Sequence, residues 1–317
     1  MEICSHGGPN LAELKALGLT PDGIYDFSVS SNPFAQPPGI KGILSSIAID
    51  RYPDSEATEL RQRLSEKLGV APDNILAGNG SMEIIRLIAM AYFRQGDSVL
   101  ILEPTFGEYE IACQIAGAKV IKQWARAEAD FAPSIQETTE IVHQNHPRGV
   151  FICNPNNPTG NYLSEEEVKK ILDSSEDSLL ILDEAFIAFV DDGWSAIDFI
   201  NRHNIVIVRS MTKDYSLAGL RLGYAVAHRG IIENLRRVCP PWNVNTVAQR
   251  VGGAILEDAG YLQQCKQKMA QSKRFLLNEL HRIGFTTVPS PTNFFLVKVG
   301  DARAFRAALL QYGILVR

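Results

Sequence analysis

The sequence predicts an α/β protein with a large domain built on a mostly parallel sheet and a smaller α+β domain beside it. Short apolar runs alternate with amphipathic helical segments between about residues 46 and 230, as expected of parallel strands that helices cover on both faces. The polar motifs of this region directly follow the apolar runs, at the carboxyl ends of the predicted strands. An open α/β sheet binds its ligand at that edge.

Six apolar runs are the predicted strands of the large domain, over residues 75–77, 99–102, 119–121, 149–153, 179–182 and 205–208. Helices are predicted between them. Leu60, Leu64 and Leu68 recur at a spacing of four in the segment 56–68, which indicates one buried helix face. Ser164 and Glu167 form a capping box for a helix over 165–174.

The chain is predicted to divide into an N-terminal arm over residues 1–45, the large domain over 46–230 and a C-terminal part over 231–317. The arm is rich in Gly, Pro, Ser and Asn and contains one short helical segment, 11–17. The C-terminal part contains a long helix over about 263–280, a strand over 294–297 and a helix over about 301–312. Arm and C-terminal part together are expected to form the smaller domain.

Composition points to a globular enzyme of a reducing compartment. The 317 residues are 45% hydrophobic and 21% charged, and the net charge of −5 does not favour nucleic acid or an anionic membrane as a partner. The five cysteines are scattered, without metal or redox spacing, so no metal site is expected. The N-terminus lacks the features of a signal peptide and no apolar run reaches membrane-spanning length, so a cytoplasmic location is expected.

Lys213 is the candidate catalytic residue. It follows the apolar strand over 205–208, and a lysine at a strand end can hold an aldehyde through a Schiff base. Ser210 and Thr212 supply hydroxyls and Arg221 a guanidinium that can bind a phosphate. A single lysine at a strand end is more often a solvated loop residue. These neighbours favour an aldehyde cofactor that carries a phosphate.

A glycine-rich turn, Gly78-Asn79-Gly80-Ser81, runs from the first predicted strand onto a helix. Free backbone N–H groups and the helix dipole favour an anion at such a helix start. Such turns are common and weak evidence alone, but a phosphate is already expected from the neighbours of Lys213. The predicted donors here are the backbone amides of Gly80, Ser81 and Met82.

The motif S-x-T-K-x-x-x-x-x-G-x-R-x-G-Y over residues 210–224 resembles the lysine signature of fold-type I pyridoxal-phosphate enzymes, the aminotransferase class I and II family. Asn-Pro-Asn-Asn-Pro-Thr-Gly at 154–160 and Asp-Glu-Ala-Phe at 183–186 strengthen the resemblance, which extends from residue 6 to residue 317. It implies pyridoxal 5'-phosphate as cofactor and an aspartate-aminotransferase-like fold. It also implies a homodimer with shared active sites, in which Tyr52 reaches the cofactor phosphate of the other subunit.

Pyridoxal phosphate needs further partners from the protein. Asp183, after its strand, is the candidate carboxylate for the ring nitrogen, although a carboxylate there could instead cap the next turn. Asn157 is the candidate donor to the phenolic oxygen. Phe106 is the first candidate to stack on the ring and Tyr109 the second, although Phe106 could equally be ordinary core.

Within this family the sequence resembles the branch that contains histidinol-phosphate aminotransferase and threonine-phosphate decarboxylase. His6-Gly7-Gly8, Phe186 in place of a tyrosine, and Pro241-Trp242-Asn243-Val244-Asn245 favour the decarboxylase. The expected reaction is therefore decarboxylation of L-threonine O-3-phosphate to (R)-1-aminopropan-2-yl phosphate in cobalamin biosynthesis. Histidinol-phosphate aminotransferase, or a related class I/II aminotransferase, and a catalytically impaired pyridoxal-phosphate-binding paralogue are the alternatives.

The substrate is expected to be a small phosphorylated amino acid. The resemblance to the decarboxylase implies that His6, Asn32 and Arg317 anchor its anionic groups. The sequence stops at residue 317, before a final strand and helix and before an arginine that binds the substrate carboxylate in these families. The C-terminal domain is therefore expected to be truncated, with substrate binding affected and cofactor binding preserved.

Overall fold

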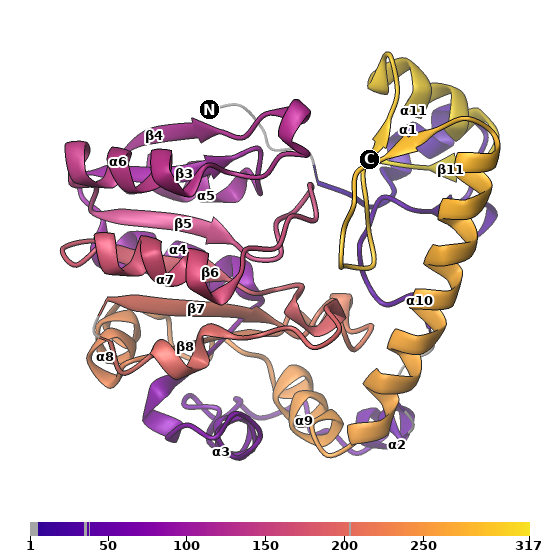
Figure 1. Cartoon of the computed structure of the whole chain (residues 1–317). Coiled ribbons are helices and arrows are strands. Elements are labelled where there is room, and N and C mark those ends of the chain that lie inside the picture. Colours follow the sequence, from indigo (N-terminus) through magenta and orange to yellow (C-terminus); the bar gives the residue numbers. More distant parts are fainter. Residues whose placement is uncertain (1–5, 35–36, 38, 203) are drawn as a thin grey trace.

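The computed structural model describes residues 6–34, 37, 39–202 and 204–317 of the chain. A seven-stranded sheet is its centre, with the strand order β2-β8-β7-β6-β5-β3-β4 (Figure 1). The strands are β2 (Ile75–Gly78), β3 (Ser98–Glu103), β4 (Lys119–Trp124), β5 (Gly149–Cys153), β6 (Leu179–Asp183), β7 (Ile205–Ser210) and β8 (Gly223–Ala227). Only β8 runs antiparallel to its neighbours in this sheet, so the predicted mostly parallel α/β fold is confirmed.

Helices cover both faces of this sheet (Figure 1). The helices that follow the sheet strands or pack on them are α3 (Thr58–Leu68), α4 (Ser81–Tyr92), α5 (Glu108–Ile115), α6 (Ile135–Asn145), α7 (Glu165–Ser174), α8 (Arg229–Val238) and α9 (Thr246–Ile255). Short 3₁₀ turns connect several elements, at Pro21–Gly23, Pro72–Asn74, Ala127–Ala129, Ile187–Phe189, Ala196–Phe199 and Ala218–Leu220. Ser164 and Glu167 form the predicted capping box at the start of α7.

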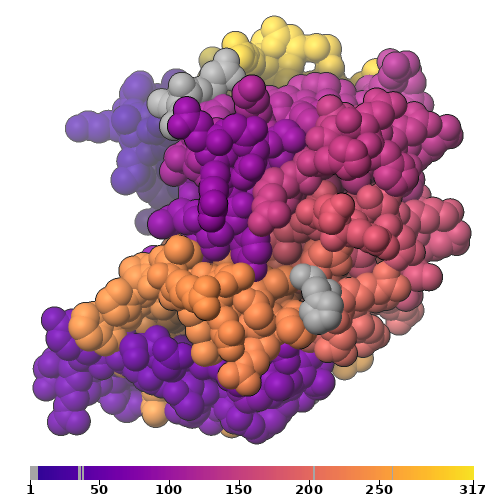
Figure 2. Space-filling model, turned by 90° about the vertical axis from the view of Figure 1, so that its left-hand side faces the viewer, coloured from indigo at the N-terminus to yellow at the C-terminus, as the bar shows by residue number. Residues whose placement is uncertain are grey.

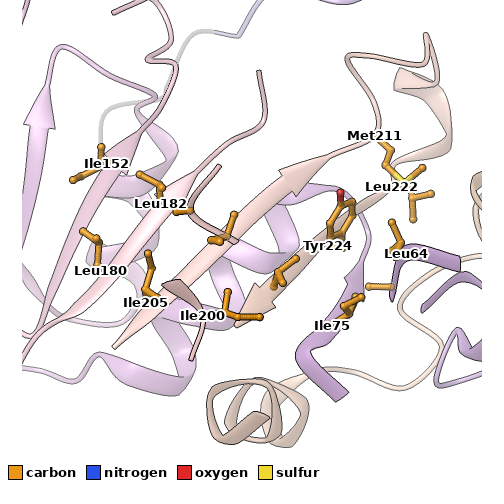
Figure 3. Packing of buried hydrophobic residues seen from close by; sticks show 14 of the residues in the cluster. Leu64, Ile75, Ile152, Leu180, Leu182, Ile200, Ile205, Met211, Leu222 and Tyr224 are labelled. Atoms are coloured by element: carbon orange, nitrogen blue, oxygen red, sulfur yellow. The ribbon is translucent and has the colours of Figure 1, made fainter. Parts of the chain in front are cut away.

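Two apolar cores follow from the alternation of side chains along the strands. On β6, Leu180 and Leu182 belong to the core that also includes residues of α3, α7 and α9 (Figure 3). Ile181, between them, belongs to the core on the other face, with residues of α4, α5 and α8. All residues of β5, β6 and β8 are buried, so these strands hold a fixed position between two helical layers.

Some packed segments lie far apart in the sequence. The purple segment around α3 lies beside orange residues of the 230–255 region on the face that Figure 2 presents, and α3 contacts α9. Strand β8 was not among the predicted strands. Its residues begin inside the lysine motif, and its place between β2 and β7 depends on long-range pairing.

The remaining elements lie opposite the carboxyl ends of the parallel strands (Figure 1). They are α1 (Leu11–Ala16), β1 (Tyr25–Asp26), α2 (Ile40–Ser45), α10 (Ala259–Arg282), β9 (Thr286–Thr287), β10 (Val297–Lys298), α11 (Ala302–Gln311) and β11 (Ile314–Leu315). Strand β1 pairs in parallel with β11, and β9 pairs antiparallel with β10. The predicted strand over 294–297 is therefore displaced, because pairing occurs only at Val297 and Lys298.

The arm packs on the C-terminal residues. Leu14 of α1 forms a small buried cluster with Leu310 and Leu315, and Arg306 of α11 binds both carboxylate oxygens of Glu13. The expectation that residues 1–45 and 231–317 share a domain, with boundaries at 46 and 230, stays a prediction. Residues 1–5, on which the absence of a signal peptide was judged, lie outside the described residues.

In the described part of the chain, no helix combines the length and the apolar character that crossing a bilayer requires. Over the same residues, no group of three or more His, Cys, Asp or Glu side chains is arranged to hold a metal ion.

Candidate active site

The carboxyl ends of β5, β6 and β7 bring the predicted site residues to one edge of the sheet. Asp183 is the last residue of β6, and the strand register pairs it with Cys153 on one side and Val208 on the other. Ser210 ends β7, three residues before Lys213. Residues that are about 30 apart in the sequence therefore meet because parallel strands end together.

Asp183 is a buried carboxylate with fixed donors. Its side chain is 3% exposed; Oδ2 accepts the hydroxyl of Tyr109 at 2.8 Å and Oδ1 accepts the backbone N–H of Ala185 at 2.9 Å. Burial raises the pKa of Asp183 to about 6, although the two hydrogen bonds and the charge of Lys213 act in the opposite direction. A cationic nitrogen beside this carboxylate would remove the cost of burying its charge, so the site fits the protonated ring nitrogen of the cofactor.

Tyr109 takes a different place from the one expected. Its side chain is fully buried, and its ring stacks on Phe151 at 4.8 Å between centroids. Because its hydroxyl donates to Asp183, it lies behind the carboxylate, which corrects the prediction that it could stack on the cofactor. Phe106, whose ring meets the Tyr109 ring edge-on at 5.6 Å, stays the predicted stacking residue.

Close backbone packing builds the predicted phosphate cradle. A Cβ at Gly80 would lie 2.7 Å from Nη2 of Arg221, and a Cβ at Gly223 would lie 2.4 Å from the backbone nitrogen of Ser81. Gly223 is in turn the register partner of Ser210. The start of α4, the end of β7 and Arg221 therefore meet at one place, where only glycine allows the approach.

The donors of this cradle fit a phosphate dianion. The hydroxyls of Ser210 and Thr212 lie 2.7 Å apart, and no side chain caps the amino end of α4 at Gly80, so its first amides are available to an anion. Met82 lies in that first turn. The structure thus brings together the predicted phosphate donors, which are Gly80, Ser81, Met82, Ser210, Thr212 and Arg221.

Lys213 is half-buried, with Nζ 5.8 Å from the ring centroid of Phe186. Burial lowers its pKa, the nearby charges of Arg221 and Arg317 lower it further, and Asp183 acts in the opposite direction. A lysine with a lowered pKa is more often neutral, which is the form that attacks an aldehyde. Arg317 is thereby placed near Lys213, and its predicted contact with substrate stays a prediction.

Asn32 lies beside Lys213, but its side chain is already engaged. Its backbone N–H donates to the carbonyl of Lys213 at 2.7 Å, and Nδ2 donates to the carbonyl of Asp214 at 2.9 Å. Nδ2 also lies 3.2 Å from the hydroxyl of Tyr261, Oδ1 accepts the N–H of Phe34, and the residue is 2% exposed. Asn32 therefore holds the backbone around Lys213, and its expected role as a substrate anchor stays a prediction.

Three further predicted residues lie around this centre. Asn157 is half-buried in the loop after β5. His6 is half-exposed, with its ring 5.9 Å from that of Phe106. Tyr52 lies on the surface, 79% exposed, and stacks on Trp242 at 4.4 Å. Their contacts with cofactor, substrate and partner subunit stay predictions.

Phe186 is the neighbour of Lys213 that lacks a hydroxyl. It is buried, and its ring meets that of Phe294 edge-on at 4.9 Å. The ring of Phe186 therefore gives the Lys213 side an apolar wall without a hydrogen-bond donor.

Comparison with known proteins places this geometry in a family. The model of the aminotransferase class I and II family matches residues 24–317. Histidinol-phosphate aminotransferase of Thermoanaerobacter pseudethanolicus is 36% identical over 92% of this chain and 84% of its own length. Histidinol-phosphate aminotransferase 1 of Cupriavidus pinatubonensis is 35% identical over 98% of this chain and 84% of its own length.

Solved structures agree with the sequence comparison. The histidinol-phosphate aminotransferase of Sinorhizobium meliloti in complex with pyridoxal 5'-phosphate superposes with a TM-score of 0.90, at 25% identity, over 99% of this chain and 87% of that chain. The L-threonine-O-3-phosphate decarboxylase of Porphyromonas gingivalis superposes with a TM-score of 0.78, at 27% identity, over 92% of this chain and 90% of that chain.

Proposed function

Since the chain belongs to the aminotransferase class I and II family and is a pyridoxal-phosphate-dependent enzyme, we propose that it transfers the amino group of histidinol phosphate to a 2-oxo acid. The observation that carries this proposal is the 36% identity to histidinol-phosphate aminotransferase over 92% of the chain. The cluster of Lys213, Asp183 and Tyr109 supports it, because it supplies the groups that such chemistry needs. Histidinol-phosphate aminotransferase, an alternative in the sequence analysis, is thereby preferred to the decarboxylation of L-threonine O-3-phosphate.

The cofactor, when bound, supplies an electron sink for negative charge on the α-carbon of the substrate. Asp183 would face the ring nitrogen and keep a proton there, and the hydrogen bond from Tyr109 would fix the orientation of its carboxylate. The cradle around Gly80 and Arg221 would hold the phosphate, and Asn157 would donate to the phenolic oxygen.

Lys213 would carry out the proton transfer. Its lowered pKa favours the neutral amine, so Nζ would accept a proton from the α-carbon of the substrate and give it up again later in the amino transfer. Asn32 donates hydrogen bonds to the backbone carbonyls of Lys213 and Asp214. These bonds fix the backbone at Lys213 and so restrict the positions that Nζ can reach. Phe186 limits water on that side of the lysine.

A specific observation favours threonine-phosphate decarboxylase as the second candidate. Phe186 occupies the position where an aminotransferase of this branch is expected to carry tyrosine, and the decarboxylase structure matches at 27% identity. The two substrates differ usefully, since histidinol phosphate has no carboxylate to lose.

Parallel assays of the purified, cofactor-loaded protein separate the candidates. Histidinol phosphate with 2-oxoglutarate should yield glutamate, and L-threonine O-3-phosphate should release no carbon dioxide. Carbon dioxide release without glutamate formation would replace the proposal by the decarboxylase. Cofactor binding with neither product would indicate the catalytically impaired alternative.

The expected homodimer belongs to the same proposal. Tyr52 and Trp242 form an exposed stacked pair, and the aromatic pair fits an interface better than a monomer surface. Sedimentation should give twice the mass of one chain for the wild type. Tyr52→Asp should shift the protein toward monomer and weaken cofactor retention, whereas a monomeric wild type would refute this part.

A further inference from the structure

The first turn of α5 carries a buried carboxylate that the cofactor site does not use. Glu108 is 5% exposed and lies in the chain between Phe106, the predicted stacking residue, and Tyr109, which donates to Asp183. Its Oε1 lies 2.8 Å from Nε2 of His6, and its Oε2 accepts Nη2 of Arg86 at 2.5 Å. A buried carboxylate is costly unless it is paired, so the arm and α4 both contribute to keeping Glu108 in place.

The arm is fixed from its other side by close packing on Ser28. A Cβ at Gly7 would lie 2.0 Å from the carbonyl oxygen of Ser28, which leaves no space for a side chain. The N–H of Gly8 donates to Oγ of Ser28 at 2.8 Å, and that hydroxyl donates to Asp26 at 2.6 Å. His6 is therefore held at both ends, through its backbone neighbours and through its ring.

Strand β1, which contains Asp26, connects the arm to the C-terminal segment. Asp26 belongs to β1, and its register partner in β11 is Leu315, two residues before Arg317. His6 and Arg317, the two basic residues expected to meet substrate, are thus positioned by one pair of strands.

We propose that Glu108 is a positioning residue that clamps His6 beside Phe106 and so forms the binding place for the phosphate group of the substrate. This inference deepens the proposed function and rests on it. A carboxylate can only accept hydrogen bonds, so Nε2 of His6 carries a proton in this pair; Nδ1 would donate to a phosphate only when the ring carries a second proton there. Its side chain is 49% exposed, which leaves it accessible to a substrate.

Arg86 adds donor capacity to this cluster. Its Nη2 pairs with Glu108, while its Nη1 is buried and has no hydrogen-bond partner among the residues that the structure describes. Buried donors are seldom left unpaired, so Nη1 of Arg86 can still take one further acceptor. Arg86 and Glu108 cancel each other's charge, so a protonated His6 would be the group that attracts a phosphate.

The variant Glu108→Gln tests the clamp, because it keeps the size of the side chain and removes its charge. We expect KM for histidinol phosphate to rise about tenfold, with kcat changed less than about twofold, because uniform substrate binding is lost. The preference for histidinol phosphate over unphosphorylated histidinol, measured as the ratio of kcat/KM values, should fall by a similar factor.

Glu110→Gln is the matched control. Glu110 lies in the same helix, and its carboxylate pairs with Lys122 away from the arm, so this variant should behave as wild type. Gly7→Ala disrupts the clamp from the other side without touching the buried carboxylate, and it should reproduce the rise in KM even where Glu108→Gln lowers stability. His6→Ala combined with Glu108→Gln should be no worse than His6→Ala alone.

Hydrogen–deuterium exchange gives a readout that is independent of turnover. The peptide that contains Gly7 and Gly8 should exchange faster in Glu108→Gln than in wild type. In Glu110→Gln its exchange rate should equal that of wild type. Unchanged exchange and an unchanged phosphate preference in Glu108→Gln and Gly7→Ala would overturn the clamp. A wild type that does not turn over histidinol phosphate would instead refute the proposed function, while the exchange comparison would still decide on the clamp.

Discussion

The residues proposed to bind the cofactor (the cofactor side) and those proposed to bind the substrate (the substrate side) are held by different kinds of structure. Asp183, Ser210 and Gly80 each lie at the end of a sheet strand or the start of the helix after it, between two apolar cores. His6 and Arg317 lie in segments joined by the two-residue strands β1 and β11. The cofactor side is therefore the rigid part of the site, and the substrate side depends on a few local contacts.

This difference has a functional meaning. Many buried contacts must be lost together before the cofactor residues can move, because strands of a central sheet unfold cooperatively. The arm can change its position at a smaller cost, so substrate preference can vary while the cofactor chemistry stays constant. We expect substitutions on the cofactor side to lower kcat and those on the substrate side to raise KM.

The largest effect is expected for Lys213→Ala. Loss of both the covalent anchor and the proton carrier should lower kcat by more than about 10³-fold. Lys170→Ala, which removes an exposed lysine paired with Glu166, is the control and should retain full activity. Steady-state kinetics with histidinol phosphate measure the effect. Activity of Lys213→Ala within tenfold of wild type would exclude Lys213 as the catalytic lysine.

Asp183→Asn should lower kcat by about 10²-fold, since an amide does not keep the ring nitrogen protonated. The same carboxyl group should also make the unfolding free energy of the cofactor-free protein depend on pH. Burial raises the pKa of Asp183 to about 6, so the folded state binds this proton more tightly than the unfolded state does. The resulting stabilisation is present below about pH 4 and is lost as the pH rises through about 6.

The variant Asp183→Asn removes this pH dependence of the unfolding free energy. Between about pH 4 and pH 7 the cofactor-free variant should therefore gain on the order of 3 kcal/mol in unfolding free energy relative to wild type. Urea unfolding at a series of pH values measures the difference. A difference that stays constant over this pH range would show that the Asp183 carboxyl is not perturbed by burial.

Tyr109→Phe should have an intermediate effect. It removes a donor to Asp183 and leaves a buried carboxylate oxygen with one partner fewer, at a cost of about 1–3 kcal/mol in unfolding free energy. The pKa of Asp183 should rise further, and kcat should fall about tenfold without a change in KM. A rise in KM with constant kcat would place Tyr109 on the substrate side and contradict the division.

The smallest effect is expected for Arg306→Gln in α11. The ion pair between Arg306 and Glu13 joins α11 to the arm, but both side chains are about one-third exposed. Its loss should lower unfolding free energy by less than about 1 kcal/mol. The hydrogen bond from Arg306 lowers the pKa of Glu13, so this contribution exists above the unfolded pKa of Glu13 and disappears as the pH falls.

KM for histidinol phosphate should rise slightly in Arg306→Gln, and cofactor affinity should not change. A double-mutant cycle with Glu13→Gln isolates the pair. Loss of cofactor affinity in either variant would show that the two sides of the site are not independent.

The sequence allowed the cofactor side to be predicted more fully than the substrate side. Lys213, Asp183 and the glycine turn at Gly80 directly follow apolar runs, so their meeting at one sheet edge could be inferred from local patterns. The role of Tyr109 could not, because its partner Asp183 is 74 residues away and only packing brings them together. The available signal was an aromatic residue in the first turn of the helix after a strand.

The arm was harder still to interpret. Asn32 precedes a proline in a polar segment, which resembles a ligand-binding loop, yet its amide is used up by the backbone after Lys213. Glu108 looked like an ordinary residue of a helix start. Its pairing with His6 spans 102 residues and depends on the tertiary fold.

A single half-reaction tests the central claim, that Lys213 and a sheet-edge cofactor site carry out transamination of a phosphorylated amine. The cofactor-loaded protein is mixed with one equivalent of histidinol phosphate, without a 2-oxo acid, and its visible absorbance is followed. The account predicts that the visible band disappears in one turnover, returns on addition of 2-oxoglutarate, and does not disappear in Lys213→Ala. An unchanged band in the wild type, or carbon dioxide release from L-threonine O-3-phosphate in its place, would contradict it.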